Sequence, residues 1–352
     1  MSLSTSSPRT ESARRTGQGS VLTKDGLKVW LGRLLESHRV IAPAVEDGVL
    51  FFQPVSRPQD VVLEGKTAIS PKGWVHPQTE VLFRVERRDG ATALESPEEP
   101  PQQVLFGVRP CDARGIKHID KVMLAEPSDG LYARRRERTA LVGLACSQAW
   151  PECFCTSLGL APDDASDVDV MLTLAGDIFL ARAVTEKGKA LLELAPLEDA
   201  PAGEPAVAQL AKFPTDGLAP AMKANFDSKY WAAVADRCIH CNICTFVCAD
   251  CYCFDVRDAH VGGTVERLRC WDSCQAYGFT RIAGGYERRA TKGERMRQRF
   301  AHKLLYYPEQ FGEPLCTGCG RCVVACPVNI DIREIIQDVL KMGVKSATAR
   351  AE

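Results

Sequence analysis

The chain has 352 residues, of which 45% are apolar and 25% charged, and its formal net charge is −1. This length and composition predict a globular protein with room for two domains and exclude a largely disordered chain. The neutral charge balance gives no basic footprint for nucleic acid, and no apolar run reaches the roughly eighteen residues of a membrane span. Neither nucleic-acid binding nor a membrane span is therefore expected.

The first half of the sequence predicts a mixed α/β domain. Residues 1–20 are small and polar without an apolar core, which indicates a flexible arm and no secretory signal. Apolar residues recur with helical spacing from Leu27 to Ser37 and from Ala113 to Leu124. Five short apolar runs predict strands: RVIAPAV, VLFFQPV, EVLFRVE, QVLFGVR and ALVGLAC. We assign residues 21–195 to this domain.

The second half has a different composition. Residues 196–220 are rich in Ala and Pro with little periodicity, which is typical of a linker. Beyond it, AMKANFDSKYWAAVADRC predicts an amphipathic helix, and cysteine-rich loops join further helical stretches. The basic run from Glu287 to Lys303 predicts either a solvated helix face or a docking surface. We expect a mostly helical domain over residues 221–345 and an α+β fold class for the whole chain.

The sixteen cysteines are unusual for a chain of this kind. An exported protein would use them in disulfides, whereas a protein in a reducing compartment would use them as thiolate ligands for metal. The missing signal and the large expected core favour the second use, in the cytoplasm.

Two cysteine runs have the spacing of two-cluster ferredoxins. CIHCNICTFVC and CTGCGRCVVACP both follow C-x2-C-x2-C-x3-C, and Pro327 follows the second. In such proteins the fourth cysteine of each run binds the cluster of the other run. The spacing therefore predicts two [4Fe-4S] clusters, the first held by Cys238, Cys241, Cys244 and Cys326, and the second by Cys316, Cys319, Cys322 and Cys248.

Zinc is the alternative metal for such cysteines. A zinc site needs four ligands for one ion, usually as two C-x2-C pairs or a Cys/His set, and two complete four-cysteine runs fit this poorly. Gly318 and Gly320 suit a loop whose amides approach a cluster, because glycine tolerates a positive φ. Ala249 stands where proline often follows the first run. His240 is either a hydrogen-bond donor near the first cluster or a surface histidine.

Longer stretches resemble one family of iron–sulfur subunits. These stretches include SPKGWVHPQTEVLF, FGVRPCDARGI and RRRERTALVGLACSQAWPECFCTSLG in the first half, and the whole segment from RCWDSC to CPVNID in the second. They are similar to the β subunits of sulfhydrogenase, an NAD(P)-linked cytoplasmic [NiFe] hydrogenase, and to the A subunits of anaerobic sulfite reductase. The likeness runs over most of residues 48 to 335.

The resemblance implies an electron-transfer subunit without a catalytic residue of its own. It would carry electrons between a flavin subunit that handles NAD(P)H and the small and large [NiFe] hydrogenase subunits. In the sulfite reductase alternative, the partners would be sirohaem subunits; a zinc-stabilised scaffold without redox function is the alternative from another class. The chain has no G-x-G-x-x-G unit and no P-loop, so FAD and NAD(P) are expected on a partner.

Eight cysteines remain outside the two runs. In the first half, four cysteines could supply a third [4Fe-4S] cluster, a small zinc site or a set of buried thiols: Cys111, Cys146, Cys153 and Cys155. A second group lies between the ferredoxin-type runs, and for it we favour thiols that line the cluster pocket: Cys251, Cys253, Cys270 and Cys274. Cys270 departs from the family resemblance, which predicts an aromatic residue there, and an exchange of Cys248 with one of this group stays open.

Overall fold

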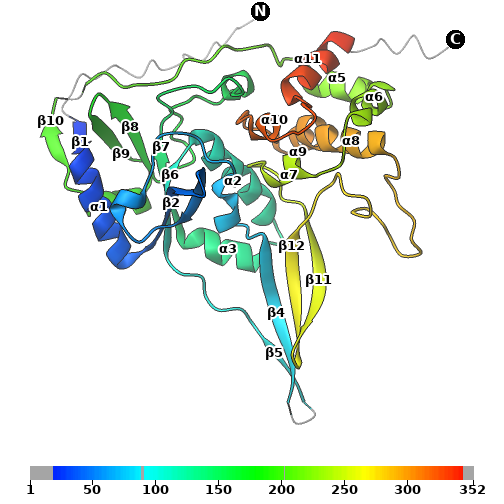
Figure 1. The fold of residues 1–352 in the computed structure, drawn as a ribbon, viewed down its shortest axis with the longest axis horizontal. Coiled ribbons are helices and arrows are strands. Elements are labelled where there is room, and N and C mark those ends of the chain that lie inside the picture. The colour runs from blue at the N-terminus through cyan, green and yellow to red at the C-terminus, as the bar shows by residue number, and fades with distance from the viewer. Residues whose placement is uncertain (1–18, 89–90, 202, 344–352) are drawn as a thin grey trace, which may run out of the picture.

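The computed structural model describes residues 19–343 apart from 89, 90 and 202 (Figure 1). Most of the predicted N-terminal arm lies outside these residues, and its last two, Gly19 and Ser20, open strand β1 (Gly19–Thr23). The last two residues of the predicted second domain, 344 and 345, also lie outside. An α/β region comes first and a mostly helical region second, which confirms the predicted fold class. The division into domains at the stated boundaries stays a prediction.

An eight-stranded sheet forms the first region, in the order β10-β1-β9-β8-β7-β6-β2-β3. Four adjacent strands, β2, β6, β7 and β8, are parallel, and the pairings on either side of them are antiparallel. Strands β6 and β7 are buried along their whole length, as expected for parallel strands covered on both faces. The further strands are β2 (Arg39–Glu46), β3 (Val49–Pro54), β6 (Gln103–Val108), β7 (Thr139–Leu144), β8 (Val170–Ala175), β9 (Ile178–Ala183) and β10 (Glu198–Ala200).

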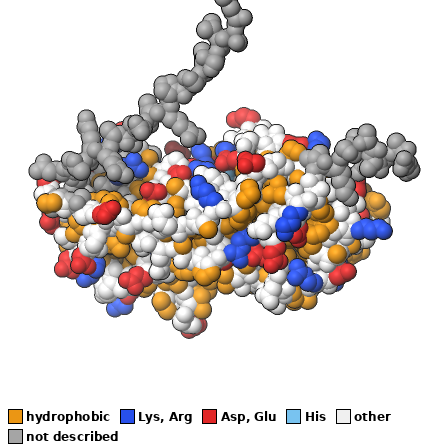
Figure 2. Space-filling view, turned by 90° about the horizontal axis from the view of Figure 1, so that it is seen from above, with side chains coloured by type: hydrophobic (Ala, Val, Ile, Leu, Met, Phe, Trp, Pro, Cys, Tyr) orange, Lys and Arg blue, Asp and Glu red, His pale blue; other side chains and the backbone are white. Residues whose placement is uncertain are grey.

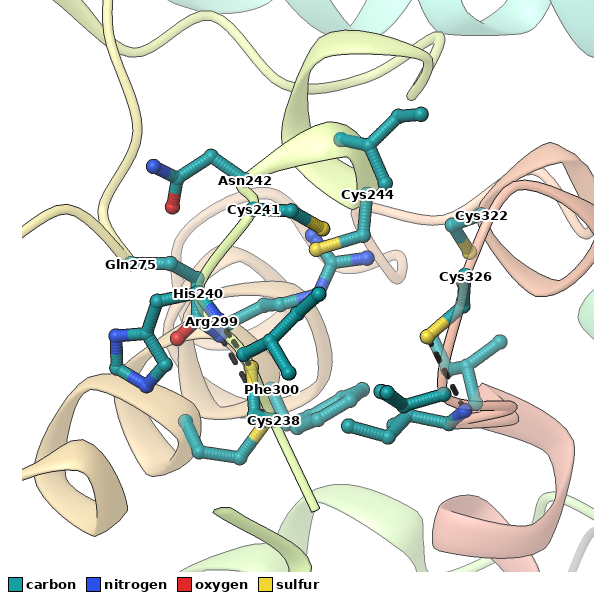
Figure 3. Close-up of a pocket in the computed structure, with 16 residues that line it drawn as sticks. Cys238, His240, Cys241, Asn242, Cys244, Gln275, Arg299, Phe300, Cys322 and Cys326 are labelled. Carbon is teal, nitrogen blue, oxygen red and sulfur yellow. Dashed lines mark hydrogen bonds between the residues drawn. The ribbon is translucent and has the colours of Figure 1, made fainter. Parts of the chain in front are cut away.

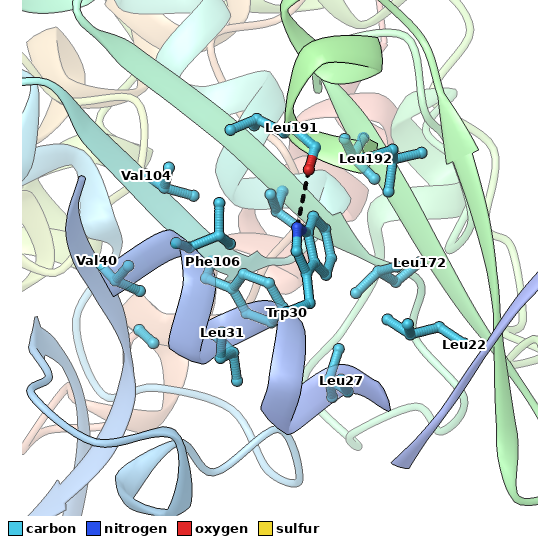
Figure 4. Close-up of a cluster of buried hydrophobic side chains, with 14 of the residues drawn as sticks. Leu22, Leu27, Trp30, Leu31, Val40, Val104, Phe106, Leu172, Leu191 and Leu192 are labelled. Carbon is cyan, nitrogen blue, oxygen red and sulfur yellow. Dashed lines mark hydrogen bonds between the residues drawn. The ribbon is translucent and has the colours of Figure 1, made fainter. Parts of the chain in front are cut away.

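Helices cover both faces of this sheet. On one face, Trp30 of α1 packs against Phe106 of β6 at 5.4 Å between ring centroids, and its indole N–H donates to the Leu191 carbonyl at 2.9 Å (Figure 4). On the other face, Ile116 of α2 packs among Leu105 and other alternate strand residues. The helices of this region are α1 (Lys24–Ser37), α2 (Pro110–Met123), α3 (Gly130–Glu137) and α4 (Glu186–Leu192).

The second region packs short helices around an apolar core that includes Trp231, Phe300 and Ile336. The predicted amphipathic helix after residue 220 is divided into α5 and α6, because Asn225 ends α5 with its side-chain amide on the Ala221 carbonyl at 2.9 Å. The helices are α5 (Leu218–Ala224), α6 (Tyr230–Asp236), α7 (Ile243–Phe246), α8 (Lys292–Ala301), α9 (Tyr307–Phe311), α10 (Arg321–Val324) and α11 (Ile332–Met342), with a π-helical turn, His302–Tyr306, after α8.

A second sheet, of four antiparallel strands, is shared between the two regions and extends away from the body as an arm (Figure 1). The first half supplies β4 (Thr79–Arg88) and β5 (Ala91–Glu95), and the segment between the ferredoxin-type runs supplies β11 (Phe254–Val261) and β12 (Thr264–Trp271). The sequence predicted helices and loops for that later segment and missed this hairpin. Strand β11 is largely exposed and β12 is mostly half-buried, and charged residues interrupt the apolar residues of both, so neither shows the regular apolar alternation that predicts a strand.

Buried polar contacts hold the two regions together. Arg321, the first residue of α10, donates two hydrogen bonds to the Asp112 carboxylate of α2, at 2.6 and 2.8 Å, and two more to Thr67. Both charged side chains are almost fully buried. A Cβ added to Gly115 of α2 would lie 2.6 Å from that of Ala249, so α2 lies directly against the end of the first cysteine run. The cysteine runs are therefore fixed against the α/β region.

On the surface, basic and acidic side chains are interspersed over the face in Figure 2, in keeping with the neutral net charge. Of the helices in the described part of the chain, none has the length and apolar character to cross a membrane.

Replacing Asp112 by alanine would leave the Arg321 guanidinium buried without its counter-charge. We expect a loss of about 3–5 kcal/mol in the free energy of unfolding, the usual cost of breaking a buried ion pair. Anaerobic denaturant unfolding measures it. Lys223→Met, which breaks an exposed pair with Glu309, is the control and should cost less than about 1 kcal/mol. Equal losses in the two variants would contradict the role of the buried pair.

Candidate iron–sulfur sites

The first cysteine run surrounds a cavity with an empty volume of about 520 Å³. In Figure 3 the sulfur atoms of Cys238, Cys241 and Cys244 lie on one side of this space, and Cys326 faces them from the second run. Backbone amides also reach the sulfurs: the His240 N–H donates to Cys238 at 3.4 Å and the Ile330 N–H to Cys326 at 3.2 Å. Cys322 lines the same cavity, so the cavity alone does not single out the four ligands of the crossed assignment, which stays a prediction.

The second run forms a more buried group. Burial is the main cause that raises the pKa of Cys316 far above its usual range, and the nearby thiolates of Cys322 and Cys248 add to it. Burial likewise raises the pKa of Cys322 to about 12, with added effects of Cys248 and Cys319. Cys248 is therefore beside the three cysteines of the second run. Which cluster each of these residues binds stays a prediction.

The two loops have the same backbone conformation but different residues at its left-handed positions. His240 and Asn242 have φ values of 56° and 63°, and Gly318 and Gly320 have 67° and 73° at the matching places. The second loop needs glycine because it packs on residues 152–155: a Cβ on Gly318 would lie 2.5 Å from the Cys155 backbone nitrogen. Histidine and asparagine fit in the first loop because they are among the residues that tolerate this conformation best.

Three basic side chains at four-residue spacing turn one face of α8 and the following turn toward these sites. Arg295, Arg299 and Lys303 are 6%, 4% and 2% exposed. Helical residues four apart lie on one face, so the three form a buried basic stripe. The prediction of a solvated face is wrong for them, whereas Arg297 on the other face pairs with the exposed carboxylate of Asp227.

Each residue of the basic stripe reaches a different part of the sites. The Arg295 guanidinium lies 3.4 Å from the His240 ring nitrogen Nδ1. Lys303 Nζ lies 3.2 Å from the Cys248 sulfur and donates to the Leu315 carbonyl at 2.8 Å. Burial alone would lower the pKa of Arg299. The thiolates of Cys244 and Cys322 flank the guanidinium, however, and they hold its pKa well above the usual range. Arg299 is thus between the first and second cysteine groups.

The Arg299 guanidinium shows whether the residues around the first cavity suit an iron–sulfur cluster. Its Nη1 is buried and has no hydrogen-bond partner among the described residues, and it lines the cavity of the first group. A buried donor without a partner is costly, so an acceptor is expected in that space. The sulfides and thiolates of a [4Fe-4S] cluster are such acceptors, and they are anionic. The residues present therefore fit the group that the spacing predicts.

A third group of cysteines lies at one edge of the large sheet. Cys111 follows β6 and Cys146 follows β7, and these adjacent strands are parallel, so their carboxyl ends meet at the same edge. Cys153 and Cys155 come from the loop after β7. All four line one cavity with an empty volume of about 420 Å³.

Cations face this third group as well. Lys66 Nζ lies 3.8 Å from the Cys153 sulfur, pairs with Glu152 and donates to the Cys319 carbonyl at 2.9 Å. Arg109, 8% exposed, lines the same cavity. Burial raises the pKa of Cys155 to about 11. Since metal binds thiolate, occupancy of the site would release protons.

The last four cysteines do not form one group. Side-chain hydrogen bonds join Cys251 to Cys248 and Cys253 to Cys274, and these bonds are the main causes that lower the pKa of Cys251 and of Cys253 to about 6. Cys270 lies within β12. Because strand side chains alternate, it faces away from Trp271, whose ring contacts Lys72 beside Cys251.

Sequence reasoning missed the cations at these sites. Lys66 belongs to no motif, Lys72 and Arg109 lie in stretches that carry the family resemblance but were not singled out there, and the basic stripe was hidden in a longer basic run. Its four-residue spacing was the available signal. Within the described ranges, no set of three or more His, Cys, Asp or Glu side chains has the geometry to bind a single metal ion.

A helical region with two loops of ferredoxin spacing, set against an α/β region, defines a dicluster iron–sulfur protein. The family of 4Fe-4S dicluster domains matches residues 237–330, which include both cysteine runs. That domain implies two [4Fe-4S] clusters and a function in electron transfer.

The comparison with curated proteins extends the match to most of the chain. Sulfhydrogenase 2 subunit beta of Pyrococcus furiosus is 32% identical over 327 residues, which cover 88% of this chain and 95% of that protein. No solved structure matches. The chain belongs to the family of sulfhydrogenase β subunits, and is an iron–sulfur subunit of a sulfhydrogenase-like oxidoreductase complex.

Replacing Gly318 by alanine should disrupt the contact between the second and third cysteine groups. The new Cβ would clash with the Cys155 backbone in addition to the cost of a left-handed conformation, about 1–2 kcal/mol. Gly312→Ala is the matched control, because Gly312 has a φ of 78° and nothing within 4 Å of its added Cβ. Anaerobic thermal unfolding with iron analysis should show a larger loss of both stability and iron for Gly318→Ala. Equal behaviour would refute the close packing.

Removing the charge of Arg299 should make the first two clusters harder to reduce. A cluster becomes more negative when it accepts an electron, and a buried cation nearby favours that state. We expect Arg299→Met to lower both reduction potentials in an anaerobic titration followed by electron paramagnetic resonance. Arg297→Met, from the outer face of α8, should leave them unchanged. Unaltered potentials in Arg299→Met would show that the guanidinium does not act on the clusters.

Proposed function

We propose that this chain relays single electrons between a flavin subunit that reacts with NAD(P)H and the [NiFe] subunits of a cytoplasmic hydrogenase. Its family membership supports a place in such a complex, and its cysteine groups support the relay. In this proposal it contributes no catalytic residue, and the flavin, the nucleotide and the nickel belong to its partners.

The relay consists of three [4Fe-4S] clusters. The third group of cysteines supplies four thiols around one cavity, the number of ligands that a cubane cluster takes, and Cys319, which we assign to the second cluster, lines the same cavity. The ligands are Cys238, Cys241, Cys244 and Cys326 for the first cluster, Cys316, Cys319, Cys322 and Cys248 for the second, and Cys111, Cys146, Cys153 and Cys155 for the third.

The observation that carries the proposal is the contact between successive groups. The Phe154 N–H, between two cysteines of the third group, donates to the Gly318 carbonyl of the second loop at 2.9 Å. Cys322 lines the cavity of the first group and is a neighbour of Cys248 in the second. The second group therefore lies between the other two, so that an electron would cross from end to end in two steps.

Both ends of this series reach the surface. Cys241 of the first group is exposed. Beside the third group, Cys153 and Trp150 line an open groove with an empty volume of about 980 Å³. The second group is covered, with Cys248 only 6% and Cys319 only 8% exposed. Partners that dock at the two ends would exchange electrons with the end clusters.

Anaerobic purification of the tagged chain from its native cell, followed by mass spectrometry, tests the partners. A [NiFe] large subunit together with a flavin subunit would support the proposal. A sirohaem subunit in their place would indicate that the chain serves a sulfite reductase. A colourless chain without partners would refute both electron-transfer functions.

Cys146→Ala tests the third cluster. We expect the purified variant to lose about four irons and four sulfides per chain and to keep the other clusters. In the assembled complex, reduction of hydrogenase clusters by NAD(P)H should then slow by orders of magnitude in stopped-flow measurements. Cys270→Ser, a cysteine outside every group, is the control. If Cys146→Ala keeps the full iron content, Cys146 binds no third cluster and the proposed relay is left with two clusters.

A further inference from the structure

A loop beside the first cysteine run has no part in the proposed relay. It spans residues 276–290, lies between β12 and α8, and projects from the body beside α8 (Figure 1). Three of its large side chains are exposed to solvent, Tyr277 by 70%, Ile282 by 46% and Tyr286 by 66%. Side chains of this size are costly to leave in water, so their exposure on one loop calls for an explanation.

The loop is built as a small hairpin. The Ile282 N–H donates to the Tyr286 carbonyl at 3.0 Å, and Arg281 and Glu287 form a β-bridge. The Glu287 carboxylate is turned inward and accepts a hydrogen bond from the Gly278 N–H of the same loop at 2.9 Å. A surface that is already ordered loses little conformational entropy when a partner binds. The exposed side chains are therefore presented on a preformed surface.

Arg295 of α8 joins this loop to the first cysteine run. Its guanidinium donates to the carbonyls of Arg289 and Ala290 at 2.7 and 2.9 Å. The same group lies 5.6 Å from the centre of the Tyr277 ring and 3.4 Å from the His240 ring nitrogen Nδ1. One buried side chain thus fixes the loop beside the first run.

The first run adds exposed apolar surface of its own. Ile239 and Ile243 are 61% and 37% exposed, and both line the cavity of the first group together with the exposed Cys241. Exposed apolar patches with a polar rim mark interaction sites, and tyrosine is enriched among the residues that contribute most to binding. The apolar surface therefore lies at the end of the relay where a partner would exchange electrons.

Positive charge borders this apolar surface. Arg281, Arg288 and Lys292 are exposed, and within the part of the chain that the structure describes none of the three forms an ion pair with a carboxylate within 4.0 Å. The carboxylates of the same segment are occupied, that of Glu287 inside the loop and that of Glu294 in the capping box of α8. These cations are thus free to pair with carboxylates of another molecule.

Lys292 brings this charge to the first group itself, because its Nζ donates to the Cys238 carbonyl at 3.3 Å. The exposed carboxylate of Asp236 lies two residues before the run, and the exposed cations outnumber it. The charge of the surface is therefore complementary to an acidic partner and would repel a basic one.

We propose that the loop 276–290 and the first cysteine run form the docking surface for an acidic redox subunit, which exchanges single electrons with the first cluster. The tyrosines and isoleucines would fill the centre of the interface, and the cations would form its rim. Charge complementarity of this kind steers the partner and speeds its association. The inference rests on the proposed function, because it assigns one partner of the relay to one surface.

Chemical crosslinking in the assembled complex tests where the partner docks. A carbodiimide condenses a lysine amine with a carboxylate into an amide and itself takes up the water. We expect mass spectrometry to find Lys292 joined to an aspartate or glutamate of the partner redox subunit. Lys292→Arg keeps the charge but has no amine, so it should lose this crosslink while the complex remains. A complex in which Lys292 joins no other subunit, while the exposed Lys223 does, would overturn the inference.

The double variant Ile282→Ser, Tyr286→Ser tests the apolar centre. We expect the dissociation constant of that redox subunit to rise at least about tenfold, measured by native mass spectrometry of the purified complex on dilution. Iron content should stay at the wild-type level, since neither residue is a proposed ligand. Leu94→Ser, 72% exposed on β5, is the control and should leave the dissociation constant unchanged. Equal dissociation constants in the double variant and wild type would reject this docking surface.

Charge reversal in Arg281→Glu, Arg288→Glu tests the acidic character of the partner. At low salt the rate of association should fall at least about tenfold, and added salt should no longer slow it. Arg281→Lys, Arg288→Lys keeps the charge and should keep the wild-type rate. An unchanged rate in the reversed variant would refute an acidic partner.

The failure of this inference can be told from that of the proposed function. A wild-type chain that purifies from its native cell without any redox subunit would refute both together. An intact complex with unaltered binding in every variant would refute this docking surface alone and leave the relay in place.

Discussion

The packing of the second cysteine loop on residues 152–155 is the contact on which the rest of the structure depends. Gly318 and Gly320 lie so close to that segment that no side chain fits at either place. The segment is held by the large sheet, because it follows β7, and α10 begins directly after the loop, where Arg321 reaches Asp112. The sheet thereby fixes the positions of the second and third cysteine groups relative to each other. The first loop keeps the same turn with His240 and Asn242, which carry side chains at the matching positions.

Buried positive charge is the second constraint. Lys66, Arg299 and Lys303 each approach a different cysteine group, and Lys72 approaches the remaining thiols. These cations are costly in an empty site and favourable beside thiolate-bound clusters, which are negative in every redox state. Since burial raises the pKa of most of the ligand thiols, uptake of metal must displace protons and should weaken as the pH falls. The same charges lower the cost of adding an electron to each cluster.

The sequence predicted the parts of this architecture that local pattern controls. Apolar runs marked the central strands, and cysteine spacing marked the two ferredoxin-type runs, because cluster geometry restricts that spacing closely. The third group was only one of several alternatives, since proximity of Cys111 and Cys146 depends on β6 and β7 being adjacent and parallel. The β11–β12 hairpin was missed because charged residues interrupt the apolar residues of both strands, so neither has a regular apolar pattern. The inward direction of the basic stripe was missed because charge alone does not tell a buried face from a solvated one.

The different accessibility of the loops constrains how the holoprotein is made. The second loop is closed off by residues 152–155 from one region and by Lys303 from the other, whereas Cys241 of the first loop stays exposed. A cofactor too large to pass between packed side chains can enter the second site only before the two regions close on each other. Biogenesis must then be ordered, with the inner cluster inserted into an open chain and the outer one added last. Because Cys241 is exposed, oxidants reach the first cluster more easily than the second, and we expect the first cluster to be the one lost first.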